Sequence, residues 1–461
     1  MQRSSHVIIG AGHTGIFLAR QLAALGHKVL LIEQLGVGGS HVFHTDLPES
    51  ILLEKSLDFA HSLKFFKDDA ERHTQLSQYR EKIFAYTQWS IAQKSKQLEQ
   101  ELNQNPRIAL LKGRAKFVKR NTLEIFDNYS QEYKLLEFDN CYLTAGKNCL
   151  AGLQVEGVQD VPVTHKWNYW QFTRVPESVA LVGFNAETLE KADFYSNFGI
   201  KVELFEAKAS WQCLEQMDLT ATNYLLKQLM AKGVEVHFES RIEKVLYLDQ
   251  KFNLYFADGY KSTVDQLYVP SKEIINGDYL NLEALKIKHS KDGVKINYRG
   301  HTNNSTVYAF GSIVDPTCKP VQALEKFLKF KELRANRNRL NPLVVTSTSL
   351  TTIQSEVQAL TRRQKVPELR IGATNSVLTV GDSEAVIRQN KGIKPKTQVF
   401  SHPGASGFVK IIYHPKSKKV LGFSTAGDLS KQYGSFLKYA YNKHLKLQEI
   451  TDFLKFDMYA R

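Results

Sequence analysis

The sequence has few cysteines and no long apolar run. The four cysteines of its 461 residues are Cys141, Cys149, Cys213 and Cys318. They lie too far apart for a CxxC redox pair or a zinc site, and their spacing does not suit a disulfide-stapled secreted domain. No stretch approaches the ~20 consecutive apolar residues of a membrane-spanning helix. The amino terminus runs directly into a strand pattern, which leaves no room for a signal peptide. We therefore expect a cytoplasmic protein that does not enter membranes.

Acidic residues are also in deficit, with 47 Asp and Glu against 61 Lys and Arg and a formal net charge of +14. Such an excess would suit an acidic partner such as nucleic acid. The basic residues are spread along the whole chain, however, and their densest group, residues 326–339, has the pattern of a helix with a solvated face. This distribution favours an ordinary charged surface, and RNA or DNA binding stays a minor alternative.

A glycine-rich loop with its full surroundings lies near the amino terminus. An apolar strand, the loop GAGHTG at 10–15, an apolar-periodic helix and a second strand ending at Glu33 follow one another. In such a βαβ unit Gly10 makes the tight turn, Gly12 lets the backbone approach a pyrophosphate, and Gly15 allows close helix–strand packing. The helix amino terminus offers N–H groups to phosphates, and Glu33 can accept hydrogen bonds from ribose hydroxyls. The pattern predicts a dinucleotide site.

A second βαβ pattern occupies residues 178–206, but its loop is degraded. The loop GFNAET keeps only the first glycine, Gly183. Asn185 places a side chain where the backbone would meet a pyrophosphate, and Thr188 is expected to intrude on helix–strand packing. The sequence therefore does not favour NAD(P) binding at this loop.

Two βαβ units followed by a different α+β tail indicate an α/β protein with three domains. We expect two Rossmann-like dinucleotide-binding domains and a C-terminal α+β domain. The expected boundaries are 1–150 with 285–340, 151–284, and 341–461.

Several motifs, in order, resemble the FAD-dependent pyridine nucleotide-disulfide oxidoreductases, the family of dihydrolipoamide dehydrogenase and mercuric reductase. The matching segments are GAGHTG with Glu33, Gly38-Gly39-Ser40, Thr144-Ala145-Gly146, Tyr308–Gly311, Val380–Ala385 and Gly407–Gly427. The resemblance implies an FAD domain, an inserted NAD(P) domain and a C-terminal domain that forms a homodimer. The residues that it implies for FAD binding are Gly10, Gly12, His13, Thr14, Gly15, Glu33, Gly39, Ser40, Thr144, Gly146, Gly311 and Ser312, the last in place of the family's aspartate.

The sequence departs from the family where the family does its chemistry. His41 and Asp46 stand at the two cysteine positions of CxxxxC, and Ser50 stands at the active-site lysine. The carboxyl-terminal HPTxxE is missing. Imidazole and carboxylate cannot form a disulfide, so this site is not expected to perform thiol–disulfide exchange. His41, His44 and Asp46 could converge on a metal ion, but no fourth ligand is identifiable and we expect no metal.

Three functions stay open. The first is an FAD-binding flavoprotein, or pseudoenzyme, that has lost disulfide chemistry. The second is an active flavin-dependent oxidoreductase with another substrate and electron acceptor, in which His41 acts as acid or base. The third is a non-catalytic scaffold or interaction protein. The intact first loop argues against the third, and the degraded second loop argues against NAD(P)H-driven turnover, so the first is favoured; the small-molecule substrate is unknown.

Overall fold

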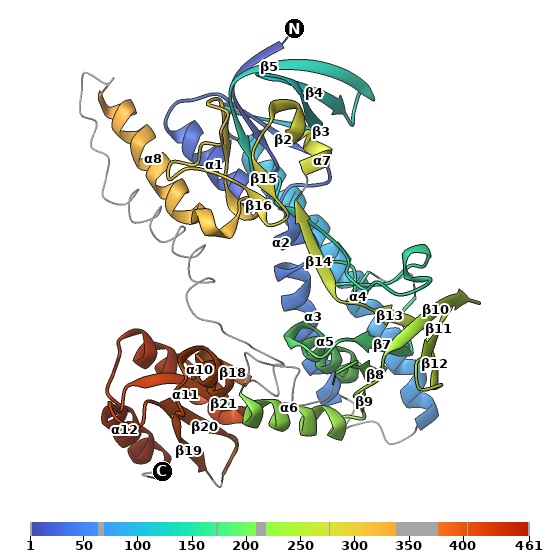
Figure 1. The fold of residues 1–461 in the computed structure, drawn as a ribbon. Coiled ribbons are helices and arrows are strands. Elements are labelled where there is room, and N and C mark those ends of the chain that lie inside the picture. The colour runs from blue at the N-terminus through green and yellow to red at the C-terminus, as the bar shows by residue number, and fades with distance from the viewer. Residues whose placement is uncertain are drawn as a thin grey trace. The chain divides into compact units, whose positions relative to one another are not determined.

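The computed structural model describes residues 2–62, 69–171, 174–208, 218–275, 277–337, 377–402 and 404–459 (Figure 1). The chain forms two compact units. The first contains residues 1–50, 85–150 and 272–363, and the second contains 51–84, 151–271 and 364–461. Strands β6 (Lys147–Ala151) and β14 (Ser271–Ile275), where the chain passes between the units, pair with each other. The three finer domain boundaries expected from the sequence stay a prediction.

The first unit is built on a mainly parallel sheet. Its strands are β1 (Gln2–Ile9), β2 (Val29–Glu33), β3 (Ile108–Lys119), β4 (Thr122–Asp127), β5 (Glu132–Leu143) and β17 (Val307–Ala309). The parallel order is β17-β5-β1-β2-β3, and β4 joins the far ends of β3 and β5 as an antiparallel meander. Apolar residues cover both faces, as a parallel sheet requires. Helices α1 (His13–Ala24) and α8 (Pro320–Arg337) pack on one face.

The remaining elements of this unit are short or connect outwards. They are α2 (Gly39–Phe43), α7 (Gly277–Leu280), β15 (His289–Ser290) and β16 (Gly293–Val294). Helices α3 (Asp46–Ser62) and α4 (Asp69–Asn103) each contain residues of both units. The basic segment expected as a helix is α8 through Arg337, and its last two residues lie outside the described residues.

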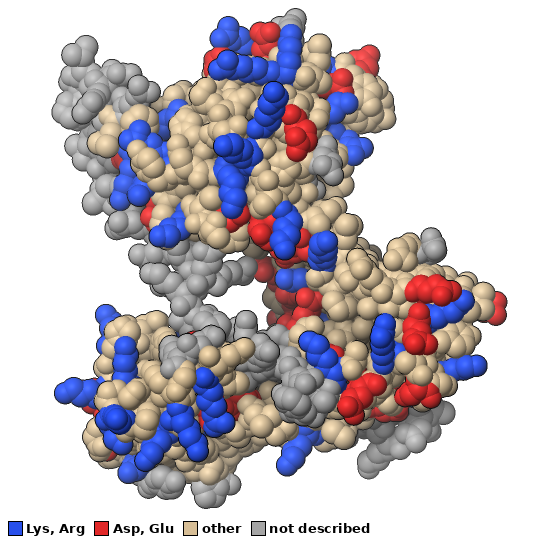
Figure 2. All heavy atoms as spheres, viewed as in Figure 1, with Lys and Arg blue, Asp and Glu red and all other residues tan. Residues whose placement is uncertain are grey.

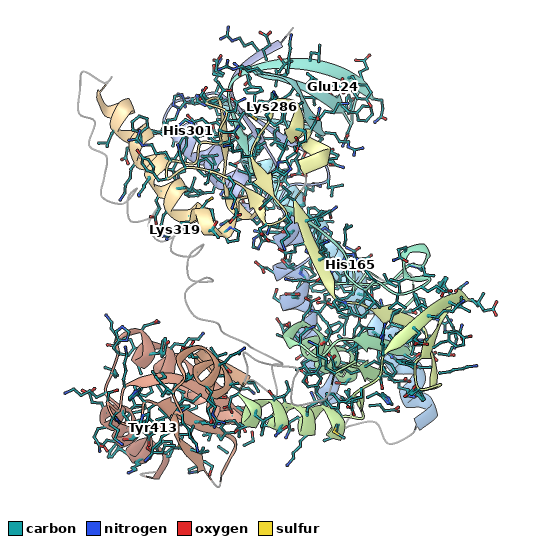
Figure 3. The ribbon with its side chains drawn as sticks, viewed as in Figure 1. Glu124, His165, Lys286, His301, Lys319 and Tyr413 are labelled. Carbon is teal, nitrogen blue, oxygen red and sulfur yellow. The ribbon has the colours of Figure 1, made fainter. Side chains whose placement is uncertain are left out.

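A group of aromatic and histidine side chains lies between the sheet and α8. His6 is buried, its Nδ1 lies 2.9 Å from the Tyr142 hydroxyl, and its ring centroid lies 4.4 Å from that of His27. His301, labelled in Figure 3, packs on Tyr308 at 4.1 Å between ring centroids. Burial lowers the pKa of His6 to about 4, and the nearby positive charges of His27 and Lys331 add to the effect. His6 is therefore neutral in the folded protein at neutral pH.

This buried histidine makes the protein less stable in acid. The ordinary histidine pKa is 6.5, so between about pH 6.5 and pH 4 the unfolded chain binds more protons than the folded one. Stability therefore falls as the pH drops through that window, by about 2 kcal/mol at pH 5 from this residue. Calorimetric unfolding at pH 7 and pH 5 should show a smaller acid loss in His6→Gln, which can still bond Tyr142. An unchanged acid loss in the variant would contradict the assignment.

The second unit contains a four-stranded parallel sheet of Rossmann type. The sheet has the order β13-β7-β8-β9 and is accompanied by two helices and an antiparallel three-stranded sheet. The strands and helices are β7 (Ser178–Val182), α5 (Ala186–Asn197), β8 (Lys201–Phe205), α6 (Leu219–Ala231), β9 (Glu235–His237), β10 (Ile242–Leu248), β11 (Lys251–Phe256), β12 (Lys261–Val264) and β13 (Gln266–Tyr268). We call this part the second Rossmann-like lobe.

The same unit ends in an antiparallel α+β domain, residues 377–459, called here the C-terminal domain. Its sheet order is β18-β21-β20-β19. The elements are β18 (Val377–Gly381), α10 (Glu384–Lys391), β19 (Lys396–His402), β20 (Ala405–Tyr413), β21 (Val420–Ala426), α11 (Gly427–Asn442) and α12 (Leu447–Tyr459). The α/β class with two Rossmann-like sheets and an α+β tail is confirmed. In the described residues no helix is long and apolar enough to cross a membrane.

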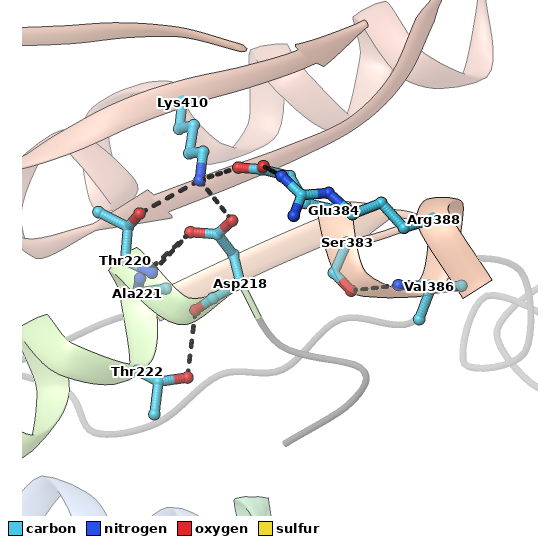
Figure 4. Close-up of polar contacts among 9 residues, drawn as sticks. All are labelled: Asp218, Thr220, Ala221, Thr222, Ser383, Glu384, Val386, Arg388 and Lys410. Carbon is cyan, nitrogen blue, oxygen red and sulfur yellow. Dashed lines mark hydrogen bonds and ion pairs between the residues drawn. The ribbon is translucent and has the colours of Figure 1, made fainter. Parts of the chain in front are cut away.

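A buried ion cluster joins α6 to the C-terminal domain (Figure 4). The Lys410 ammonium on β20 lies 2.6 Å from the Asp218 carboxylate, 2.5 Å from that of Glu384 and 3.2 Å from the Thr220 hydroxyl. The Lys410 and Asp218 side chains are 7% and 1% exposed. Asp218 also caps α6 by accepting from the Thr220 and Ala221 amides. Lys410 is thus the cation on which two carboxylates converge.

Candidate dinucleotide-binding site

The glycine-rich loop joins β1 to α1 at the carboxyl end of the parallel sheet. Gly10 has φ +106°, and an added Cβ would lie 2.7 Å from the Thr144 carbonyl oxygen. A Cβ on Gly15 would lie 1.9 Å from the Gly10 carbonyl oxygen. Both positions therefore require glycine, one for the turn and one for the contact between helix and strand, which are the roles that their spacing predicts.

Gly12 differs, because its Cβ would meet no protein atom closer than the Gly39 Cα at 3.8 Å. Packing within the chain does not demand a glycine there. Gly39 has φ +60° and backs onto Gly12. Gly12 is the N-cap of α1, and no side chain caps that helix end. The space beside Gly12, at the positive end of a helix, fits a phosphate that must approach the backbone closely.

Glu33 ends β2 with its carboxylate directed at the loop. One oxygen accepts from the Ala11 amide at 2.7 Å, and the other accepts from the Leu35 amide at 2.9 Å. Each carboxylate oxygen has a second lone pair, so a ribose hydroxyl can still donate to it. Two backbone amides therefore hold the Glu33 carboxylate in place, and it can still accept the hydrogen bonds from ribose that the sequence predicts.

Two further segments reach the same loop from β5 and β17. The Thr144 hydroxyl donates to the Gly10 carbonyl at 2.8 Å. A Cβ on Gly311 would lie 2.8 Å from the Thr14 hydroxyl, and one on Gly146 would lie 3.4 Å from the Ser312 hydroxyl. The structure thus brings together the three segments 10–15, 144–146 and 311–312, which are far apart in the sequence.

The helix α2 and the start of α3 carry the residues at the expected cysteine positions. His41 Nδ1 contacts the Asp46 carboxylate, and the His13 and His41 ring centroids lie 5.9 Å apart. Ser40 contributes its carbonyl oxygen to the His44 amide at 2.9 Å. Among the described residues no group of three or more His, Cys, Asp or Glu side chains is arranged to hold a metal ion. The contact fixes His41 as part of an imidazole–carboxylate pair.

Among the described residues no disulfide links Cys141, Cys149 and Cys318. Cys141 and Cys149 are buried, Cys318 is partly exposed, and Cys213 lies outside the described residues. Burial raises the pKa of the Cys141 thiol above its usual value, so this residue is a poor nucleophile.

The second loop also joins a strand to a helix beside an acidic residue, but here side chains of the loop form hydrogen bonds with backbone amides at the start of α5. Glu206 accepts from the Phe184 amide at 2.8 Å, as Glu33 does from Ala11. The Asn185 side chain accepts from the Thr188 amide, and the Thr188 hydroxyl accepts from the Asn185 amide, each at 3.1 Å. This is a complete capping box on α5. The expected steric conflict at Thr188 is not found, because its buried hydroxyl donates to the Gly183 carbonyl at 2.7 Å.

Sequence reasoning missed a carboxylate at the same helix end. Glu187, in the first turn of α5, accepts hydrogen bonds from the Tyr268 and Ser271 hydroxyls. Burial and the Glu187 charge raise the pKa of Tyr268, so it stays protonated as the donor. A negative group thus occupies the first turn of α5, where an anionic ligand would bind. Only the glutamate itself was visible in the sequence, because its partners are more than 80 residues away.

A parallel sheet with an open glycine loop at its carboxyl edge defines a Rossmann-type dinucleotide-binding protein. The family model for pyridine nucleotide-disulphide oxidoreductases matches residues 4–327. The chain belongs to this family, which confirms the resemblance.

Individual relatives agree. A mercuric reductase of Acidithiobacillus ferrooxidans is 25% identical over 317 residues, 67% of this chain and 56% of the relative. A dihydrolipoyl dehydrogenase of Zymomonas mobilis is 22% identical over 446 residues, 91% of this chain and 88% of the relative. Among solved structures, a Cu(II) complex of a variant of the HOCl-induced flavoprotein disulfide reductase RclA from Escherichia coli has a TM-score of 0.75 at 19% identity, covering 97% of this chain and 94% of that one. This structural likeness shows the shared fold.

Proposed function

We propose that the protein is an FAD-binding flavoprotein that does not perform disulfide exchange. The observation that carries this is the convergence of the three segments 10–15, 144–146 and 311–312 on a helix end that no side chain caps, beside an open Gly12. The residues proposed to hold FAD are Gly10, Gly12, His13, Thr14, Gly15, Glu33, Gly39, Ser40, Thr144, Gly146, Gly311 and Ser312. An absorption spectrum of the purified protein tests it: flavin bands are expected, and a colourless protein that takes up no added FAD would refute it.

Within this site the chain's own residues have separable tasks. The first-turn amides of α1 bind the pyrophosphate, the Glu33 carboxylate accepts from ribose, and the Ser312 hydroxyl offers one hydrogen bond to the ribityl chain in place of the family's aspartate. Bound FAD would supply two-electron redox chemistry. His41 and Asp46, at the positions of the family's cysteine pair, cannot exchange disulfides. These positions support the loss of disulfide reductase activity.

We infer that the second Rossmann-like lobe does not hold NAD(P) through its glycine loop. The capping box occupies the Thr188 amide in the first turn of α5, and the Glu187 carboxylate opposes a pyrophosphate. Anaerobic titration of the holoprotein with NADH or NADPH should therefore leave the flavin unreduced. The combined variant Asn185→Gly, Glu187→Ala, Thr188→Gly uncovers the helix end and should bind NADH detectably by equilibrium dialysis. Bleaching of the wild-type flavin by NAD(P)H would contradict the inference.

The His41–Asp46 pair favours a second candidate, a flavin-dependent oxidoreductase with another electron acceptor. Asp46 contacts Nδ1 of His41, so Nε2 is the ring nitrogen that could take part in acid–base chemistry with a substrate. If His41 serves turnover, photoreduced His41→Gln holoprotein should reoxidise about tenfold or more slowly with oxygen or a quinone, given the usual worth of such catalysis. His44→Gln is the matched control. Equal rates in wild type and both variants would leave only the binding function.

We further propose that the protein is a homodimer formed through its C-terminal domain. This domain exposes Tyr439 on α11 and Phe453 and Phe456 on α12, the last 76% exposed, as an interface would. Sedimentation of the full chain is the direct test. We also propose that the protein is cytoplasmic and that its basic surface does not bind nucleic acid.

A further inference from the structure

The C-terminal domain contains a cavity of about 580 Å³. It lies between the turn that joins β20 to β21 and the turn that joins α11 to α12. Its lining residues are Ser417, Lys418, Lys419, Val420, Ala440, Tyr441, His444, Leu445, Lys446, Leu447 and Gln448. The volume falls within the roughly 300–1,000 Å³ of small-molecule sites. No part of the dinucleotide site contributes to it.

The lining divides into an apolar floor and a basic rim. Val420, Tyr441, Leu445 and Leu447 pack against the core of the C-terminal domain, so the floor is continuous with that core. The rim carries three lysines and one histidine, and the lining contains no carboxylate. In the space-filling view the C-terminal domain shows many Lys and Arg side chains and few acidic ones (Figure 2). An apolar floor beneath a rim of three lysines, with no carboxylate in the lining, favours an amphipathic anion.

Both turns are fixed by hydrogen bonds of their own. His414 Nδ1 accepts from the Lys416 amide at 3.2 Å and from the Ser417 amide at 3.1 Å, just after Tyr413 (labelled in Figure 3) ends β20. Glu449, which does not line the cavity, accepts from the Lys446 amide at 2.7 Å. A ligand would therefore meet a rim whose backbone is already ordered, which reduces the entropy lost on binding.

The two turns also place a lysine and a histidine where glycine is usual. Lys418 has φ +58° and His444 has φ +55°, both in the left-handed region. A side chain there costs about 1 kcal/mol relative to glycine. Lys418 thus puts a positive charge at the rim despite that cost.

We propose that this cavity binds a small organic phosphate with an apolar body. Lys418, Lys419 and Lys446 bind the phosphate as point charges, and the floor takes the apolar part. The site is separate from the proposed flavin site and does not depend on it.

Equilibrium dialysis of 1-naphthyl phosphate against the full chain tests the proposal. The protein is loaded with FAD and then freed of unbound FAD, so that the dinucleotide site is filled and no free FAD competes for the cavity. One saturable site per chain is expected. Inorganic phosphate and 1-naphthol should each bind at least about tenfold more weakly, because the first lacks the apolar ring and the second lacks the phosphate. Absence of saturable binding at millimolar probe, or equal binding of inorganic phosphate, overturns the proposal.

Variants locate the site without touching the core. Lys418→Gln, Lys419→Gln and Lys446→Gln combined should weaken probe binding about tenfold or more, since three surface charges are lost. The matched control removes three exposed lysines of the first unit, by Lys286→Gln, Lys288→Gln and Lys291→Gln, and should change binding less than about twofold. Equal weakening in both triples would show general charge attraction and refute the site.

A last variant tests the cavity itself. Gln448→Trp fills the mouth without changing charge and should abolish binding of 1-naphthyl phosphate. Unchanged binding in that variant would place the probe elsewhere on the surface and would also refute the proposal.

Discussion

Replacing Gly12 with valine should abolish FAD binding while leaving the fold intact. A Cβ at this position meets nothing closer than 3.8 Å, and the backbone is extended with φ −73°, which valine adopts readily. The new side chain instead fills the space where the pyrophosphate approaches α1. Losing even two phosphate hydrogen bonds, at about 1.5–3 kcal/mol each, lowers affinity about a hundredfold or more. Flavin absorbance per protein and the circular dichroism spectrum are the two measurements.

The matched control is Asn185→Val, the corresponding position of the second loop. It removes the capping oxygen from α5 and should cost about 1 kcal/mol of stability, with flavin content unchanged. Loss of flavin in both variants would show that the two loops have been assigned wrongly. Retention of flavin in Gly12→Val would show that the pyrophosphate does not lie beside α1.

The first glycine loop could be predicted from the sequence because its requirements are local. Gly10 is needed for its φ of +106° and Gly15 for its contact with the Gly10 carbonyl, both within the loop, although Thr144 and Ala145 from another segment also lie close to these positions. Regular βαβ spacing then placed Glu33 at the end of the adjacent strand. The same reasoning predicts that Asn185 obstructs the second loop, but it could not predict that Asn185 and Thr188 satisfy each other's backbone amides.

What the sequence could not show depends on contacts between distant segments. Glu187 is held by Tyr268, 81 residues away, and Lys410 by Asp218, 192 residues away. A charged residue in a strand or a helix start normally faces water, so each member alone predicts an exposed side chain. Only the folded chain brings them into the same buried place. The His41–Asp46 contact spans five residues, yet the sequence left open whether the two side chains meet.

The Lys410 cluster should be the most sensitive point of the C-terminal domain. Lys410→Met leaves the Asp218 carboxylate, 1% exposed, without its cation, whereas Glu384 keeps the Arg388 guanidinium at 3.3 Å. Burial of Lys410 opposes its charge, but the hydrogen bonds to Asp218 and Glu384 raise its pKa overall, so the folded protein holds it as an ammonium. Removing one partner of a buried ion pair typically costs about 3–5 kcal/mol, because the remaining charge stays desolvated. Denaturant unfolding should show a loss of this size, with faster hydrogen exchange in α6 and β20.

Two further variants distinguish a buried charge from a lost contact. Lys396→Met, on the neighbouring strand β19, removes an exposed lysine and should change stability by less than about 0.5 kcal/mol. Adding Asp218→Asn and Glu384→Gln to Lys410→Met removes the three charges that meet at the ammonium and keeps a side-chain oxygen to cap α6. The Arg388 guanidinium, which is 57% exposed, keeps its charge in water. Most of the lost stability should then return, because buried ion pairs replaced by neutral groups of similar volume are often near neutral in free energy. A loss in Lys410→Met no larger than in Lys396→Met would mean that water reaches the cluster in solution. If the triple variant does not recover stability, the loss in Lys410→Met comes from the missing hydrogen bonds of the ammonium. It would then not come from a carboxylate left without a cation.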